Sequence, residues 1–230
     1  MGVYPDTISY RADIYDLQTS RFLYSENHAE RWENQKHVQS EVLYRDATEK
    51  PFALKLINYN KIPYSPSFQL DDYRTGYQEG ASYTNDSYKV YFRKNKKEAL
   101  QESLLKLSSP VVTDGGLDYF LKTHIDRLNR GEVIRANFIV AHRLTYYSCR
   151  AEKVSNTSVN GKQAVLVRLE PESWIVRTLS DPIFVTYDLE SKRLLVYEGN
   201  SNIEDETTTS NHKIRAVFTY FDNSKKTALK

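Results

Sequence analysis

Cysteine is almost absent from this chain of 230 residues, where Cys149 is the only one, and methionine occurs once. A single cysteine excludes an internal disulfide framework and a cysteine-rich zinc site. No run of about 18 apolar residues occurs, so no segment of the sequence is predicted to cross a membrane as a helix. The formal net charge of +2 gives no bulk electrostatic basis for binding nucleic acid or an anionic membrane.

Tyrosine, in contrast, is abundant, with 18 copies in a chain that is 40% hydrophobic and 27% charged. Tyrosine favours strands, because its ring packs on the pleated surface while its hydroxyl can still reach water. This composition predicts a globular protein built on a sheet with a half-exposed aromatic face. A chain of this length can bury a core without the help of disulfides or metal ions.

Residues 1–10 (MGVYPDTISY) lack the apolar segment of a signal peptide. The sequence therefore predicts either a cytoplasmic protein or a mature protein whose leader has been removed. Because scarce cysteine and methionine suit an oxidising compartment, we expect a periplasmic or secreted protein, with a cytoplasmic one as the alternative.

Alternation of apolar and polar residues predicts an antiparallel meander over residues 8–93. Within it, Phe52, Leu54 and Leu56 share one face of a predicted strand. Residues 61–80 carry two prolines and two glycines, which predicts a long loop.

A helical insert is predicted over residues 96–131. Leucines at i, i+4 and i+7 predict a first helix in residues 96–107. The 3.6-residue apolar period predicts a second helix over residues 114–130, with Thr113 or Asp114 as its cap and Gly131 just past its end.

A second meander is predicted over residues 133–221. Residues 135–154 are expected to form one long strand, and Asn160-Gly161 is a strong hairpin signal. Residues 200–211 lack the frame of a calcium-binding loop and predict a flexible segment. The chain 1–230 is therefore predicted to be a single, mainly β, α+β domain. It would contain a curved antiparallel sheet of about nine or ten strands, a half-open barrel, with two helices packed on it.

Neither metal binding nor a known catalytic motif is indicated. The histidines are scattered, without HxH, HExxH or CxxC spacing, so we expect no metal site and no cofactor. The sequence has no G-x-S-x-G elbow, and Cys149 and Arg150 should point to opposite faces of their strand, so no catalytic residue is assigned. The short basic run FRKNKK has no stacking aromatics in phase, and nucleic acid is not an expected partner. The five histidines are His28, His37, His124, His142 and His212.

The order of a meander, a helical insert and a second meander resembles bacterial envelope proteins of the LolA/LppX kind. Residues 171–203 (PESWIVRTLSDPIFVTYDLESKRLLVYEGNSNI) are also similar to the C-terminal strands of uncharacterised bacterial proteins of the DUF3108 type. The first resemblance implies a half-open barrel with helices as a lid, which carries lipids or lipoprotein acyl chains. It implies lipid binding in the periplasm and supplies no catalytic residue.

We therefore expect a non-enzymatic binding or carrier protein of the bacterial envelope, with a lipid or another apolar or amphipathic ligand in the concave face. The same side chains could instead form a plain core. One alternative is a hydrolase of envelope glycans or esters that uses strand carboxylates and a histidine such as His142. Another is an assembly partner that pairs through a sheet edge; the oligomeric state is left open. The expected ligand-binding residues are Ile183, Val185, Tyr187, Phe138, Val140 and Trp174.

Overall fold

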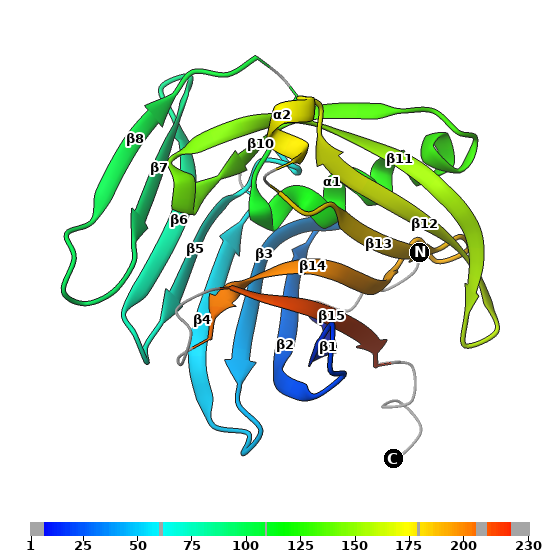
Figure 1. The fold of residues 1–230 in the computed structure, drawn as a ribbon, viewed down its shortest axis with the longest axis horizontal. Helices are drawn as coiled ribbons and strands as arrows, with labels where there is room; N and C mark the ends of the chain where they lie inside the picture. Colours follow the sequence, from blue (N-terminus) through cyan, green and yellow to red (C-terminus); the bar gives the residue numbers. More distant parts are fainter. Residues whose placement is uncertain (1–6, 60–61, 109, 179, 206–210, 222–230) are drawn as a thin grey trace.

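The computed structural model describes residues 7–59, 62–108, 110–178, 180–205 and 211–221. Fifteen strands in this part of the chain form one sheet. Figure 1 shows that this sheet is curved. The order runs from β8 down to β1, continues with β15 and then runs down to β9. Neighbouring strands are antiparallel, except that β9 lies parallel to β10. The predicted fold class, mainly β with a curved antiparallel sheet, is confirmed.

The first eight strands form a continuous meander. Its hairpin turns are shaped by side chains such as Asp16, whose Oδ1 accepts hydrogen bonds from the Thr19 amide (2.7 Å) and hydroxyl (2.7 Å). The strands are β1 (Thr7–Asp16), β2 (Phe22–Glu33), β3 (Lys36–Arg45), β4 (Pro51–Asn58), β5 (Ser67–Asp72), β6 (Tyr77–Thr84), β7 (Ser87–Arg93) and β8 (Gln101–Leu105).

The second half contains the helices and the remaining strands. Asn160 and Gly161 both have positive φ, 51° and 79°, so the predicted tight turn joins β11 to β12. β15 returns to pair with β1, which joins the two halves of the sheet. The elements are β9 (Val111–Val112), η1 (Asp114–Gly116), α1 (Leu117–Asn129), β10 (Ile134–Val140), η2 (Ala141–Arg143), β11 (Thr145–Val159), β12 (Lys162–Pro171), α2 (Trp174–Arg177), β13 (Ile183–Asp188), β14 (Leu194–Glu204) and β15 (Asn211–Tyr220).

The sheet curls until its two ends approach each other. η2, which follows β10, contacts β6 and β7 from the other end of the sheet. Ile139 and Ala141 are buried in one apolar cluster with Tyr88 and Val90. Side-chain packing therefore brings the ends together, whereas backbone pairing in the described residues stops at β8 and β9, leaving a half-open barrel. Pairing of a partner through one of these edges stays a prediction.

Helix α1 lies between the two halves of the curved sheet (Figure 1). Its buried face packs against Val165, Val167, Val185 and Tyr187 of β12 and β13. Before the helix, Gly116 approaches the backbone of Tyr64 so closely that a Cβ atom would clash with the Tyr64 carbonyl oxygen. None of the described helices is both long enough and apolar enough to cross a membrane. The side chains of the buried face are Phe120, Leu121, Ile125 and Leu128.

A second part of the interior is filled by the end of β14. The pairing of β14 with β15 is irregular between Asn200 and Glu204. Beyond Asn200, Ile203 is 2% exposed and packs in one cluster with residues of β1, β2 and β5. The segment that the sequence predicted to be flexible is thus a buried strand end up to Glu204, while residues 206–210 lie outside the described residues.

The predicted first helix is wrong, because residues 101–105 form strand β8. β7 offers an unpaired strand edge, and pairing with it satisfies the backbone groups of residues 101–105. Leu104, which would have faced a core in the helix, is instead exposed. The second helix of the fold is α2, a single turn at Trp174–Arg177 that the sequence pattern did not predict.

Two other predictions need correction. Residues 61–80, expected to be a loop, contain β5 and the start of β6, and β5 pairs with both β4 and β6. Residues 135–154 form two strands, because η2 and a left-handed Leu144 (φ 52°) reverse the chain. In β4, Lys55 lies on the same face as the buried Ala53 and Ile57, while on the other face Phe52 is buried and Leu54 and Leu56 are half-buried.

We expect the Ile203→Ala variant to lose about 2–5 kcal/mol of unfolding free energy, because a buried side chain is truncated and leaves a cavity. The control is Ile175→Ala on the exposed face of α2, which should change stability by less than about 0.5 kcal/mol. Urea unfolding followed by circular dichroism measures both. Equal losses in the two variants would show that Ile203 does not fill the interior.

Candidate functional site

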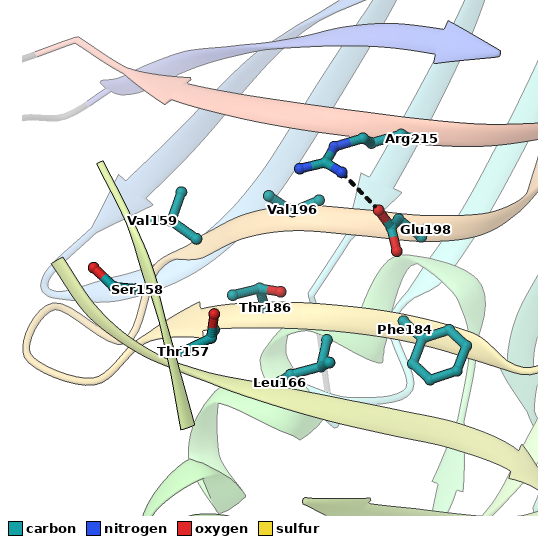
Figure 2. A pocket seen from close by; sticks show the side chains of 9 residues that line it. All are labelled: Thr157, Ser158, Val159, Leu166, Phe184, Thr186, Val196, Glu198 and Arg215. Atoms are coloured by element: carbon teal, nitrogen blue, oxygen red, sulfur yellow. Dashed lines mark hydrogen bonds and ion pairs between the residues drawn. The ribbon is translucent and has the colours of Figure 1, made fainter. Parts of the chain in front are cut away.

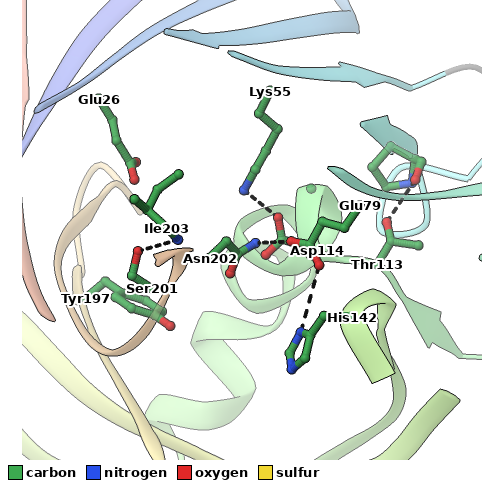
Figure 3. A network of polar contacts seen from close by, with 12 residues as sticks. Glu26, Lys55, Glu79, Thr113, Asp114, His142, Tyr197, Ser201, Asn202 and Ile203 are labelled. Atoms are coloured by element: carbon green, nitrogen blue, oxygen red, sulfur yellow. Dashed lines mark hydrogen bonds and ion pairs between the residues drawn. The ribbon is translucent and has the colours of Figure 1, made fainter. Parts of the chain in front are cut away.

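Five polar side chains from separate elements converge inside the curved sheet, as Figure 3 shows. Strand alternation places Lys55 on the same face as Ala53 and Ile57, which are buried. We call the set the polar cluster. Its members are Lys55 of β4, Glu79 of β6, Asp114 of η1, His142 of η2 and Asn202 of β14.

Lys55 and Asp114 form an ion pair with an Nζ–Oδ2 distance of 2.6 Å. Burial by itself would lower the pKa of Lys55, but the attraction of Asp114 and nearby acidic groups raises it well above its ordinary value. The Tyr59 hydroxyl donates to the Gly115 carbonyl at 2.8 Å, beside this pair. Together these contacts attach the start of α1 to the first meander. The prediction that Thr113 or Asp114 caps the helix is wrong: Gly116 occupies the N-cap position of α1, and neither there nor at Thr113 before η1 is there a side-chain cap hydrogen bond.

Glu79 is the most buried charged side chain of the cluster, with 2% exposure. Asn202 Nδ2 donates a 2.9 Å hydrogen bond to Glu79 Oε1 and so connects β14 to β6 across the interior. Burial and the repulsion of Asp114 raise the pKa of Glu79 to about 7, although Lys55 opposes them. This carboxyl group therefore exchanges its proton near neutral pH.

His142 connects the cluster to solvent, because its side chain is 41% exposed. Its Nδ1 lies 3.8 Å from Glu79 Oε2, a distance too long for a direct hydrogen bond. Partial burial and the nearby Arg143 lower the pKa of His142, which favours the neutral ring at pH 7. A neutral imidazole beside a carboxyl group that titrates near pH 7 can accept and return a proton.

The cluster has no arrangement for metal binding or for a serine nucleophile. No group of three or more His, Cys, Asp or Glu side chains in the described residues is placed to hold a metal ion. Ser201, beside Asn202, exchanges a 2.6 Å hydrogen bond with the Tyr24 hydroxyl and is buried. Cys149 lies elsewhere, and burial raises the pKa of its thiol to about 12, which disfavours the reactive thiolate.

Four of the six predicted ligand-binding residues come together beneath α1. Val185 and Tyr187 are buried in the apolar cluster that α1 covers, and Ile183 and Phe138 pack against it. The Tyr187 hydroxyl donates to Asp118 Oδ1 of α1 at 2.9 Å.

The other two predicted residues lie apart from this group. Val140 is half-buried at the end of β10, next to η2. Trp174 is 69% exposed, so it does not contribute to the interior. The reason is that β12 ends at Pro171 and the following turn, α2, lies outside the sheet.

Two of the openings in the described part of the chain lie outside the polar cluster. A cleft of about 370 Å³ separates α1 from β10. Its lining includes Phe120 and Ile134, which belong to the same apolar cluster as Val185 and Tyr187. The full lining of this cleft is Tyr64, Pro110, Phe120, His124, Arg127, Val133, Ile134 and Arg135.

The second opening, of about 250 Å³, lies over β13 and β14 (Figure 2). The end of the β11–β12 hairpin forms one side, and an Arg215–Glu198 ion pair of 3.1 Å lies on the other. Phe184 and Thr186 line this groove, and they alternate along β13 with the buried Val185 and Tyr187, so the groove is on the convex face.

Sequence reasoning missed most of the polar cluster. A signal was present in β4, where Lys55 interrupts the otherwise apolar stretch FALKLI. Glu79 was hidden in a segment predicted to be a loop, and Asn202 in one predicted to be flexible. His142 was named as a possible catalytic residue, but within a continuous strand and without a partner.

No family model and no curated protein matches this chain. Among solved structures, it is similar to the crystal structure of a β-barrel-like protein of the domain of unknown function DUF1849 from Brucella abortus. The sequences are 8% identical, the TM-score is 0.49, and the match covers 94% of this chain and 97% of that chain.

The buried Glu79 makes stability depend on pH. Because its pKa is raised from 4.5 to about 7 on folding, the folded state holds the proton more tightly than the unfolded state. The stabilisation that comes from this tighter proton binding by Glu79 is fully present below about pH 4.5 and is lost as the pH rises through about 7. For a shift of this size the loss is about 3 kcal/mol.

We expect the Glu79→Gln variant to lose this pH-dependent fall in unfolding free energy, since glutamine stays neutral and keeps an acceptor for Asn202. Chemical unfolding at a series of pH values from about 4.5 to 8 measures the effect. Glu102→Gln, on the exposed edge strand β8, is the matched control and should keep the wild-type profile. An unchanged profile in Glu79→Gln would contradict the assignment.

Proposed function

We propose that this protein is a non-enzymatic binding or carrier protein of the bacterial envelope, which holds an amphipathic ligand against the concave face beneath α1. The observation that carries the proposal is the cleft between α1 and β10. It opens at the surface, and its lining includes Phe120 and Ile134 of the buried apolar cluster. Its volume, about 370 Å³, falls in the range of small-ligand sites, roughly 300–1,000 Å³.

In this proposal α1 stays in a fixed position over the sheet, and the ligand enters through the cleft between α1 and β10. The Lys55–Asp114 pair holds the start of the helix. At the other end, Lys153 Nζ donates to the carbonyl and side-chain oxygens of Asn129, each at 3.0 Å. A helix attached at both ends keeps its apolar face over the sheet while one side remains open.

The envelope location belongs to the same proposal. It is supported by the scarcity of cysteine and methionine and by the resemblance to LolA/LppX-like and DUF3108-type proteins. The curved sheet with a helix across its concave face is compatible with a carrier.

Titration with the fluorescent fatty acid 11-(dansylamino)undecanoic acid tests the proposal. We expect a saturable rise in fluorescence, because the probe moves from water into an apolar site. Val133→Trp should weaken binding at least about tenfold, since the larger side chain fills the cleft that Val133 lines. Val154→Trp, at an exposed position of β11, is the matched control and should bind normally. A linear, non-saturable response of the wild-type protein would refute the carrier function.

The geometry also favours a second candidate, a hydrolase of envelope glycans or esters. Its specific support is the convergence of Glu79, Asp114 and His142, with a carboxyl group that titrates near neutral pH. Glu79 would act as the acid–base group and His142, the more exposed of the two, would face the substrate.

Hydrolysis of p-nitrophenyl esters and of peptidoglycan fragments by the purified protein tests this candidate. Activity is expected to depend on pH with an inflection near 7 and to fall at least about 100-fold in Glu79→Gln, as for loss of a general acid–base group. Glu102→Gln again serves as the control. Turnover that is equal in the wild type and Glu79→Gln would exclude this mechanism.

A further inference from the structure

The cleft between α1 and β10 has a basic rim above an apolar floor. Phe120, His124 and Arg127 lie at spacings of four and three residues, which places them along one stripe of the helix. The facing wall contains Ile134 and Arg135. The lining therefore combines buried apolar side chains with two guanidinium groups and one imidazole.

The charges of this lining are of one sign, because none of its residues is acidic. Each arginine does have a carboxylate neighbour outside the lining. Arg127 Nε lies 2.8 Å from Glu132, and Arg135 Nε lies 2.6 Å from Glu172. These contacts hold the two side chains in place through one nitrogen each.

The remaining guanidinium donors are available. Within the described part of the chain, no hydrogen bond involves the terminal NH₂ groups of Arg127 or Arg135. A guanidinium has five N–H donors in a rigid fork, so each arginine can bind an anion without releasing its glutamate. His124 is held in place by Nδ1, which donates a 2.8 Å hydrogen bond to the Phe120 carbonyl.

We propose that the cleft binds the anionic head group of a single-chain amphiphile, with a carboxylate at Arg127 and Arg135 and the acyl chain over Phe120 and Ile134. This inference rests on the proposed carrier function and narrows it to one ligand class. Charge complementarity at the rim and apolar continuity with the cluster beneath α1 support it. A neutral lipid of the same chain length would leave the guanidinium donors unused.

The test compares 11-(dansylamino)undecanoic acid with its methyl ester, each titrated into the wild-type protein and into the Arg127→Gln/Arg135→Gln variant. The wild type should bind the acid at least about tenfold more tightly than the ester, and the variant should bind the two equally. Added salt should weaken binding of the acid more than that of the ester. Arg31→Gln is a matched control, since Arg31 is 55% exposed and paired with one glutamate, as the 50% exposed Arg127 is.

The outcomes separate this inference from the carrier function. Saturable binding of acid and ester with equal affinity would overturn the head-group site and leave the carrier function standing. Absence of saturable binding for both probes would overturn both. Displacement of the probe by millimolar acetate would show a site for small free anions and not for an amphiphile. The wild-type comparison of acid with ester involves no substitution, so it decides the question even if the variant folds poorly.

Discussion

The ion pair between Lys55 and Asp114 is the contact on which the arrangement of the interior depends. It joins β4 of the first meander to the turn before α1, while the helix packs its apolar face on the second meander. A buried pair adds little net stability, because desolvation offsets the attraction, but removal of one partner leaves an uncompensated charge that costs about 3–5 kcal/mol. The pair therefore contributes little net stability, and its main effect is to fix the position at which α1 begins.

The same pair determines the electrostatics around Glu79. Asp114 raises the pKa of Glu79 by repulsion and Lys55 lowers it, with burial as the largest influence. Asn202 then ties this carboxyl group to the end of β14, which also carries Ile203 into the interior. The position of the helix, the closure of the interior and the titration of Glu79 are thus linked through neighbouring side chains.

Local patterns predicted the elements whose structure is determined locally. Asn160-Gly161 forms its turn and Gly131 follows α1 with a φ of 90°, because these residues adopt backbone conformations that others avoid. The pattern failed where pairing decided the outcome. Residues 101–105 became a strand through contact with β7. Glu79 was hidden because the two prolines and two glycines of residues 61–80 predicted a loop, although pairing with β5 and β7 makes its segment a strand. The contact between Lys55 and Asp114 joins residues 59 positions apart in the sequence. It therefore depends on the curvature of the whole sheet and not on any local spacing.

The distribution of charge along α1 also orients the proposed ligand. The polar cluster lies near the start of α1. It contains two carboxyl groups, Glu79 and Asp114, and one lysine, Lys55. An anionic head group in that region would meet repulsion and would have to lose its hydration. At the α1–β10 cleft it would instead meet Arg127 and Arg135 at the solvent boundary. The ligand would thus keep its charge at the rim and place its apolar chain inward, as an amphiphile requires.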